Sequence, residues 1–227
     1  MKSDRILING PAGNIEAVFD TSAMAQVASV AGTAGAADPA DAPPRRGLAL
    51  VAHPHPLYGG TLDNKVAQIL AKTFVELGYV AVRPNFRGAG ASEGAHDDGN
   101  GETDDLVAVV QFARQRAGLE DIASAPVVLA GFSFGSLVQS RVALKLAARG
   151  IAVERMVFVG TAVTRGKVED VPANTIVIHG ELDDTVPLDA VLRWAEPQEL
   201  PVTVIAGADH FFHRRLHVIK GIITRAW

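Results

Sequence analysis

The 227-residue sequence contains no cysteine, which excludes a disulfide framework, a thiolate zinc site and a cysteine nucleophile. It has no uninterrupted run of about 18 apolar residues, so neither a transmembrane helix nor a membrane partner is expected. The N-terminal segment lacks the apolar stretch of a secretory signal peptide, which favours a cytoplasmic location. Basic charge is not in excess, because the formal net charge is −4, and a nucleic-acid partner is therefore not expected.

The chain does contain enough apolar material for a folded domain. Hydrophobic residues make up 48% and charged residues 20%, which excludes intrinsic disorder for most of the chain. This length suits a single α/β domain, and we predict one domain over residues 1–227. Residues 21–46 differ because they are rich in Ala, Gly, Asp and Pro. We interpret them as a surface insertion with at most one short helix.

Apolar periodicity predicts a regular alternation of strands and helices from residue 47 onward, after an N-terminal antiparallel hairpin. The predicted strands cover residues 5–9, 15–19, 48–52, 79–83, 127–132, 156–159, 175–179 and 202–205, and the predicted helices cover 64–77, 102–117, 134–148, 188–194 and 210–227. Asp63 and Asn64 are expected to cap the first helix, which Gly78 ends. The alternation requires a mostly parallel sheet with helices on both faces, so the fold class is α/β. Ligands should bind beyond the carboxyl ends of the strands.

Residues 131–135 read Gly-Phe-Ser-Phe-Gly and lie between an apolar strand and a helix. This G-x-S-x-G pattern in a strand–turn–helix context is typical of a nucleophile elbow. Small residues must flank the serine because the turn is tight, and the serine hydroxyl then projects above the sheet. Ser133 is therefore our candidate nucleophile, and a helix N-cap is the alternative role for it.

A serine hydroxyl needs a base, and the base needs an orienting acid, in the chain order Ser, Asp, His for this kind of elbow. Two carboxylates follow the next-to-last predicted strand, and Asp183 is the candidate acid with Asp184 as the alternative. Both could instead cap a helix. His210 follows the last predicted strand and is the candidate base, with His213 as the alternative.

These three motifs resemble the α/β-hydrolase superfamily, and two more strengthen the likeness. They are His-Pro-His-Pro-Leu-Tyr-Gly-Gly-Thr at 53–61 and Arg-Pro-Asn-Phe-Arg-Gly-Ala-Gly-Ala-Ser at 83–92, in which Arg87 is expected to anchor loops. The likeness covers residues 47–227 and points to the small capless hydrolases near the dienelactone-hydrolase and serine-aminopeptidase-like branches. It implies an α/β-hydrolase fold that needs no cofactor and no metal. Residues 160–174, where related enzymes commonly carry a lid, are too few for one, so no lid domain is expected.

The resemblance implies that the loop after residues 48–52 supplies the second N–H group of an oxyanion hole, beside the N–H of Phe134. The usual His-Gly pair is replaced here by His55-Pro56, and a proline has no N–H to donate. Leu57 is then the expected donor, with the His55 N–H as the alternative. Losing one such donor typically lowers kcat about 10²- to 10³-fold.

A site without a lid is open, which suits small acyl esters or thioesters. His55, Tyr58 and Phe211 are the candidate substrate-pocket residues, and Phe134 offers a further apolar wall. His53 and His55 are expected to shape their loop rather than take part in the chemistry. The expected partner is a small-molecule acyl substrate, and the oligomeric state is left open between monomer and homodimer.

We therefore predict a serine hydrolase that forms an acyl-enzyme on Ser133 and releases the acyl group with water. The alternatives are an aminopeptidase- or amidase-type serine hydrolase and a non-catalytic binding protein on the same scaffold. A metal-dependent hydrolase is a further alternative, because His53 and His55 have ligand-like spacing. The residues that could join them as ligands are His179, Asp183 and His210.

Overall fold

The structure is a computed structural model that describes residues 1–22, 45–116, 119 and 122–227. The predicted surface insertion at 21–46, with its short helix, therefore lies almost wholly outside the described residues. Within the described ranges, no helix is long and apolar enough to cross a membrane.

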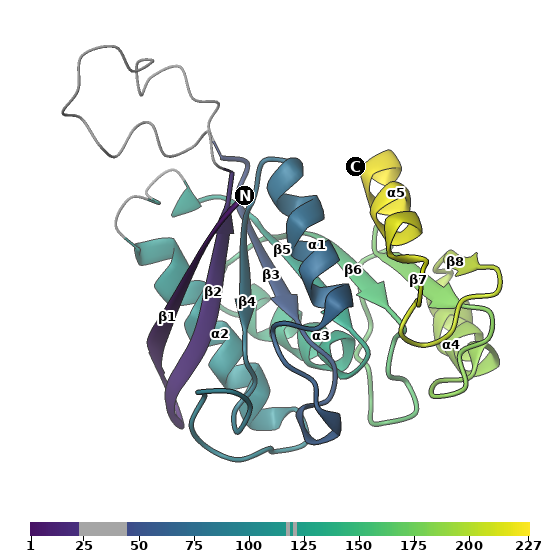
Figure 1. Cartoon of the computed structure of the whole chain (residues 1–227), viewed down its shortest axis with the longest axis horizontal. Coiled ribbons are helices and arrows are strands. Elements are labelled where there is room, and N and C mark those ends of the chain that lie inside the picture. Colours follow the sequence, from purple (N-terminus) through teal and green to yellow (C-terminus); the bar gives the residue numbers. More distant parts are fainter. Residues whose placement is uncertain (23–44, 117–118, 120–121) are drawn as a thin grey trace, which may run out of the picture.

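Within the described residues, eight strands form one sheet in the order β1-β2-β4-β3-β5-β6-β7-β8 (Figure 1). The strands are β1 (Lys2–Gly10), β2 (Gly13–Thr21), β3 (Leu48–Ala52), β4 (Val80–Pro84), β5 (Val127–Phe132), β6 (Val153–Val159), β7 (Ile176–Gly180) and β8 (Val202–Ile205). β2 pairs antiparallel with both β1 and β4, and all the other neighbouring pairs are parallel. A mostly parallel sheet with an N-terminal antiparallel hairpin confirms the predicted fold class.

Helices cover both faces of this sheet. In the described part of the chain they are α1 (Lys65–Glu76), α2 (Asn100–Gln115), α3 (Phe134–Ala147), α4 (Leu188–Ala195) and α5 (Leu216–Ala226), with two short 3-10 helices, η3 (Pro56–Tyr58) and η5 (Glu196–Gln198). α1 and α5 pack together over one face, and α2 and α3 pack together over the other (Figure 1). The loops beyond the carboxyl ends of the parallel strands are the place where such folds bind ligands.

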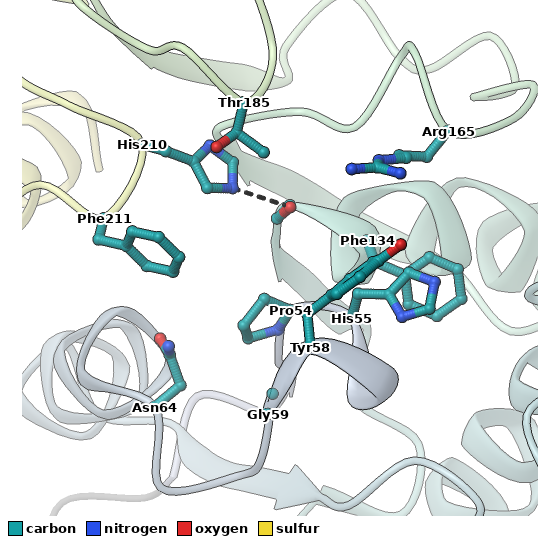
Figure 2. A pocket seen from close by; sticks show the side chains of 12 residues that line it. Pro54, His55, Tyr58, Gly59, Asn64, Phe134, Arg165, Thr185, His210 and Phe211 are labelled. Carbon is teal, nitrogen blue, oxygen red and sulfur yellow. Dashed lines mark hydrogen bonds between the residues drawn. The ribbon is translucent and has the colours of Figure 1, made fainter.

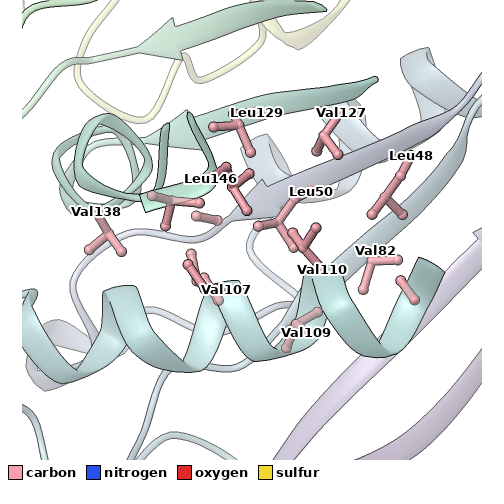
Figure 3. Close-up of a cluster of buried hydrophobic side chains, with 14 of the residues drawn as sticks. Leu48, Leu50, Val82, Val107, Val109, Val110, Val127, Leu129, Val138 and Leu146 are labelled. Atoms are coloured by element: carbon pink, nitrogen blue, oxygen red, sulfur yellow. The ribbon is translucent and has the colours of Figure 1, made fainter. Parts of the chain in front are cut away.

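The hydrophobic core lies on both sides of the central strands, because their side chains alternate between two apolar clusters. In β3, Leu48 and Leu50 pack on the side of α2 and α3 (Figure 3), whereas Ala49 and Val51 pack on the side of α1 and α5. All four side chains are fully buried. Burial on both faces explains why the central strands are continuous apolar runs rather than alternating patterns.

The N-terminus of α1 is capped by Asn64 rather than by Asp63. The Oδ1 atom of Asn64 accepts two backbone N–H groups of the first helical turn. Asp63 lies one residue too early for this role and instead accepts a hydrogen bond from Arg5 at 3.0 Å. The expected capping role is therefore confirmed for Asn64 and wrong for Asp63. Gly78, with a φ of 93°, follows the end of the helix as predicted.

The last helix begins at Leu216, six residues after the predicted start at His210. Phe212 and Arg214 have φ values of 53° and 60°, a left-handed conformation that interrupts a helix. His210 therefore lies in the loop between β8 and α5. His213 lies in the same loop, where it is exposed and bonded to a neighbouring aspartate.

Candidate active site

Ser133 occupies a sharp turn between β5 and α3. Its φ of 54° and ψ of −121° are rare for a residue with a side chain. A Cβ atom at Gly131 would lie 2.5 Å from the backbone of Gly135, and one at Gly135 would lie 2.4 Å from the carbonyl oxygen of Ala52. Close backbone approach therefore requires both glycines of the G-x-S-x-G pattern.

The Ser133 hydroxyl belongs to a line of three side chains. It lies 3.0 Å from Nε2 of His210 (the dashed line in Figure 2), and Nδ1 of His210 lies 2.7 Å from Oδ2 of Asp183. A carboxylate can only accept, so Nδ1–H donates to Asp183 and Nε2 accepts the hydroxyl proton. The Ser133 side chain makes no capping hydrogen bond to α3, which disfavours the alternative role of a helix cap.

Asp183 is held in place by the backbone that follows it. Its Oδ1 atom accepts the N–H groups of Thr185 and Val186 at 3.0 and 2.8 Å, which leaves Oδ2 for His210. The side chain is fully buried. Asp184 is exposed, and its bond among the described residues is to the Thr185 hydroxyl at 3.4 Å. The structure thus brings Asp183, and not Asp184, to His210.

His53 organises the loop beyond β3. Its Nδ1–H donates to the carbonyl oxygen of Pro54 at 2.6 Å, and its Nε2 accepts the N–H of Phe86 at 2.9 Å. Burial lowers the pKa of His53 from 6.5 to about 4, so the ring is neutral near pH 7. These contacts confirm the expectation that His53 shapes its loop.

We expect the free energy of unfolding to fall as the pH falls from about 6.5 to about 4, because the unfolded chain takes up a proton at His53 before the folded chain does. At about 1.4 kcal/mol for each pKa unit, His53 contributes about 3 kcal/mol above this window and loses it across the window. Urea titrations at pH 7.5 and 4.5 measure the effect. His53→Gln should lose less stability between these pH values than the wild type.

The exposed His217 provides the matched control for this experiment. His217→Gln removes an imidazole from the surface of α5, and it should keep the wild-type dependence of stability on pH. The same pH dependence in the wild type and in both variants would contradict the argument from burial.

The residues of the metal-dependent alternative do not form a ligand cluster. Within the described ranges, no group of three or more His, Asp or Glu side chains is arranged to hold a metal ion. Both ring nitrogens of His53 face backbone groups, and Nε2 of His179 lies 2.9 Å from the carbonyl oxygen of Val186. The geometry therefore does not favour a metal centre built from these side chains.

The backbone donors near Ser133 argue against Leu57 in the oxyanion hole. The Leu57 N–H donates to Nδ1 of His55 at 3.3 Å, because the His55 side chain caps η3, and Leu57 itself is 70% exposed. In the part of the chain that the structure describes, the N–H groups of His55 and Phe134 donate to no protein acceptor. This arrangement favours the alternative donor, the His55 N–H, over Leu57.

A cavity of about 300 Å³ opens onto the Ser133 hydroxyl (Figure 2). It is lined by Pro54, His55, Tyr58, Gly59, Gly60, Asn64, Ser133, Phe134, Arg165, Thr185, His210 and Phe211. The predicted pocket residues His55, Tyr58 and Phe211 all lie on its wall, as does Phe134. The centre of the His55 ring is 4.8 Å from that of Tyr58 and 4.7 Å from that of Phe134, so this wall is a cluster of tilted rings in contact.

Arg165 is a pocket residue that the sequence motifs did not indicate. It lies in the connection between β6 and β7, and its guanidinium carbon is 5.3 Å from the centre of the Tyr58 ring. The signal available in the sequence was its position, because a loop beyond the carboxyl end of a parallel strand faces the ligand. None of the lining residues is Asp or Glu, so Arg165 makes one end of the cavity positive.

Arg87 fixes the loop beyond β4 against the first turns of α2. Its guanidinium donates to both carboxylate oxygens of Asp105 at 2.8 and 2.9 Å, and to the carbonyl oxygen of Gly101 at 2.8 Å. Such bidentate pairing orients both groups. The predicted loop-anchoring role of Arg87 is confirmed.

Known proteins resemble this chain over nearly its whole length. Residues 38–159 match the family model described as X-Pro dipeptidyl-peptidase (S15 family). An uncharacterized protein of Rickettsia prowazekii is 32% identical, over 92% of this chain and 82% of that protein. A solved structure from Xanthomonas campestris, described as an α/β serine hydrolase without a lid, is 31% identical, with a TM-score of 0.81 over 100% of this chain and 94% of that one. An α/β serine hydrolase homologue from Coxiella burnetii is 30% identical, with a TM-score of 0.77 over 99% and 97% of the two chains.

Proposed function

The chain belongs to the α/β-hydrolase superfamily, in the X-Pro dipeptidyl-peptidase (S15) family, and from this premise we propose that it cleaves small acyl esters or thioesters at Ser133. It is a serine hydrolase of the α/β fold, like its two solved relatives, of which the Xanthomonas campestris protein is described as lacking a lid. The proposal adds the type of bond and the roles of single residues. One observation carries it, namely the hydrogen-bonded line from Ser133 through His210 to Asp183.

The reaction that this line supports has two halves. First, Nε2 of His210 takes the hydroxyl proton as Oγ of Ser133 attacks the carbonyl carbon, and the tetrahedral intermediate expels the alcohol or thiol, which takes that proton from His210. Then water attacks the acyl carbon, its proton passes to His210, and the bond to Oγ breaks as Ser133 recovers the proton and the acid leaves. Asp183 keeps the imidazole in the required tautomer and stabilises the imidazolium.

The oxyanion of the tetrahedral intermediate would be bound by two backbone donors, the N–H groups of Phe134 and His55. The first residue of α3 contributes Phe134, whose N–H points out of the helix N-terminus, where negative charge is stabilised. A structure of the protein labelled with a fluorophosphonate tests the pair. We expect the phosphonyl oxygen about 2.7–3.1 Å from both nitrogens. An oxygen bonded to the Leu57 nitrogen instead would reject His55 as a donor.

The cavity favours an acyl ester over a peptide with a free N-terminus, although the family model takes its description from dipeptidyl-peptidases. A site for a terminal ammonium group needs a partner of opposite charge, since a desolvated cation is costly unless it is paired. None of the lining residues carries a carboxylate. Arg165, in contrast, is a lining residue with a permanent positive charge. A dipeptide ammonium would therefore meet repulsion at the positive end.

We expect stoichiometric labelling of the wild-type protein by a fluorophosphonate, together with faster hydrolysis of short-chain p-nitrophenyl esters than of an aminoacyl-proline p-nitroanilide. A panel of esters with rising acyl length should show a sharp loss of kcat/KM for long chains, because the cavity of about 300 Å³ is at the small end for ligand sites.

Two outcomes would contradict this proposal. Preference for the aminoacyl-proline amide would favour the peptidase alternative. Folded protein that resists labelling and hydrolyses no ester would favour a non-catalytic binding protein. Circular dichroism of the same sample separates the second outcome from simple misfolding.

A further inference from the structure

We infer that Arg165 binds a carboxylate at the far end of a short acyl group, so that the substrates are half-esters or half-thioesters of small dicarboxylic acids. The inference rests on the proposed function, because it assigns the two sides of the cavity from the acylation reaction at Ser133. It also gives a role to Arg165, the cation that the short connection between β6 and β7 places on the pocket wall.

The position of His210 decides which half of the substrate reaches Arg165. The leaving alcohol must lie near Nε2 of His210, because it takes its proton from that atom. Figure 2 shows His210 and Phe211 on one side of the pocket and Arg165 and Tyr58 on the other. The leaving group therefore lies toward Phe211, and the acyl group extends toward Tyr58 and Arg165.

The charge of Arg165 is not neutralised by the protein. Among the described residues, its guanidinium lies over the face of the Tyr58 ring and forms no ion pair. The nearby carboxylates have other neighbours, because Asp98 lies 3.3 Å from a ring nitrogen of His96 and Glu102 accepts the backbone N–H groups of Asp97 and Gly99, both at 2.9 Å. A cation held over an aromatic ring at a pocket wall remains free to bind an anion.

The shape of the guanidinium and the size of the cavity limit the anion. A planar fork of N–H donors matches a carboxylate in bidentate geometry. A cavity of about 300 Å³ leaves room for only a few methylene groups between the reacting carbonyl and that carboxylate. An acyl chain of about the length of glutarate meets both limits.

Two ethyl esters of equal length test the inference, since both release ethanol and differ in one terminal group. Monoethyl glutarate ends in a carboxylate, and ethyl pentanoate ends in a methyl group. The wild type should prefer monoethyl glutarate in kcat/KM, and Arg165→Gln should lower that preference about 10- to 100-fold, as expected for a hydrogen bond between charged groups. Arg165→Lys should restore part of it, and Arg165→Glu should reverse it.

Lys167→Gln is the matched control, because Lys167 lies in the same loop, is 77% exposed at its side chain and pairs with Glu169 outside the pocket. It should leave the preference unchanged. The same loss in Lys167→Gln as in Arg165→Gln would reduce the effect to general charge and overturn the inference. So would an unaltered preference in Arg165→Gln, or hydrolysis of neither ester by protein whose Ser133 is labelled by a fluorophosphonate. In that last case the proposed hydrolase function would still stand, whereas absence of labelling would remove it.

Discussion

Ser133→Ala is expected to remove nearly all ester hydrolysis, with a fall in kcat of about 10⁶-fold, and to abolish labelling by a fluorophosphonate. The variant keeps the cavity and the backbone donors, so a small residual rate above that of water should remain. Because the hydroxyl and the imidazole act as a unit, His210→Ala should cost about as much, and the double variant should be no slower than either single one. Initial rates on a p-nitrophenyl ester measure all three.

The chain offers its own control for the histidine. His213 lies three residues further in the same loop, is exposed and pairs with Asp209. His213→Ala should therefore retain wild-type turnover. Additive losses for Ser133→Ala and His210→Ala, or a large loss for His213→Ala, would contradict the proposed roles.

Asp183→Asn should lower kcat about 10⁴-fold while changing the shape of the site very little. An amide can turn its NH₂ group toward Nδ1 of His210, which then becomes an acceptor, so that Nε2 carries a proton and can no longer take one from Ser133. The backbone N–H groups that now reach Oδ1 can still be accepted by the amide oxygen. The fall should therefore be seen in kcat with little change in KM or in thermal stability.

Asp184→Asn is the matched comparison, because the same chemical change is made one residue further on, at an exposed carboxylate. It should alter kcat less than about threefold, within the range of surface substitutions. If Asp184→Asn were the damaging variant and Asp183→Asn the neutral one, the assignment of the orienting acid would be reversed.

The central part of the fold could be predicted from the sequence because it is buried on both faces. The bounds of β3, β5 and β8 agree with the predicted strands at 48–52, 127–132 and 202–205. In β3 and β5 every residue is buried, so an unbroken apolar run marks them. The pairing of Ser133 with His210 could likewise be predicted, because each follows a strand of one parallel sheet whose carboxyl ends lie at the same edge.

Other features depend on geometry that a linear pattern does not contain. The positive φ values of Phe212 and Arg214 delay the last helix, although neither residue type favours that conformation. The Leu57 N–H is occupied because it donates to the His55 side chain. That contact depends on the rotamer of His55, which the sequence does not specify. Arg165 could be placed near the sheet edge from its position, but its contact with Tyr58 joins segments more than a hundred residues apart.

The strained turn at Ser133 sets stability and reactivity against each other at a single position. A residue with a side chain in this conformation costs about 1–3 kcal/mol, which is a sizeable part of the net stability of a domain. Glycine would relieve that strain, but it would also remove the nucleophilic hydroxyl. A stabilising substitution at this position would therefore abolish turnover. Substitutions that raise the stability of the chain without loss of activity must lie away from the turn.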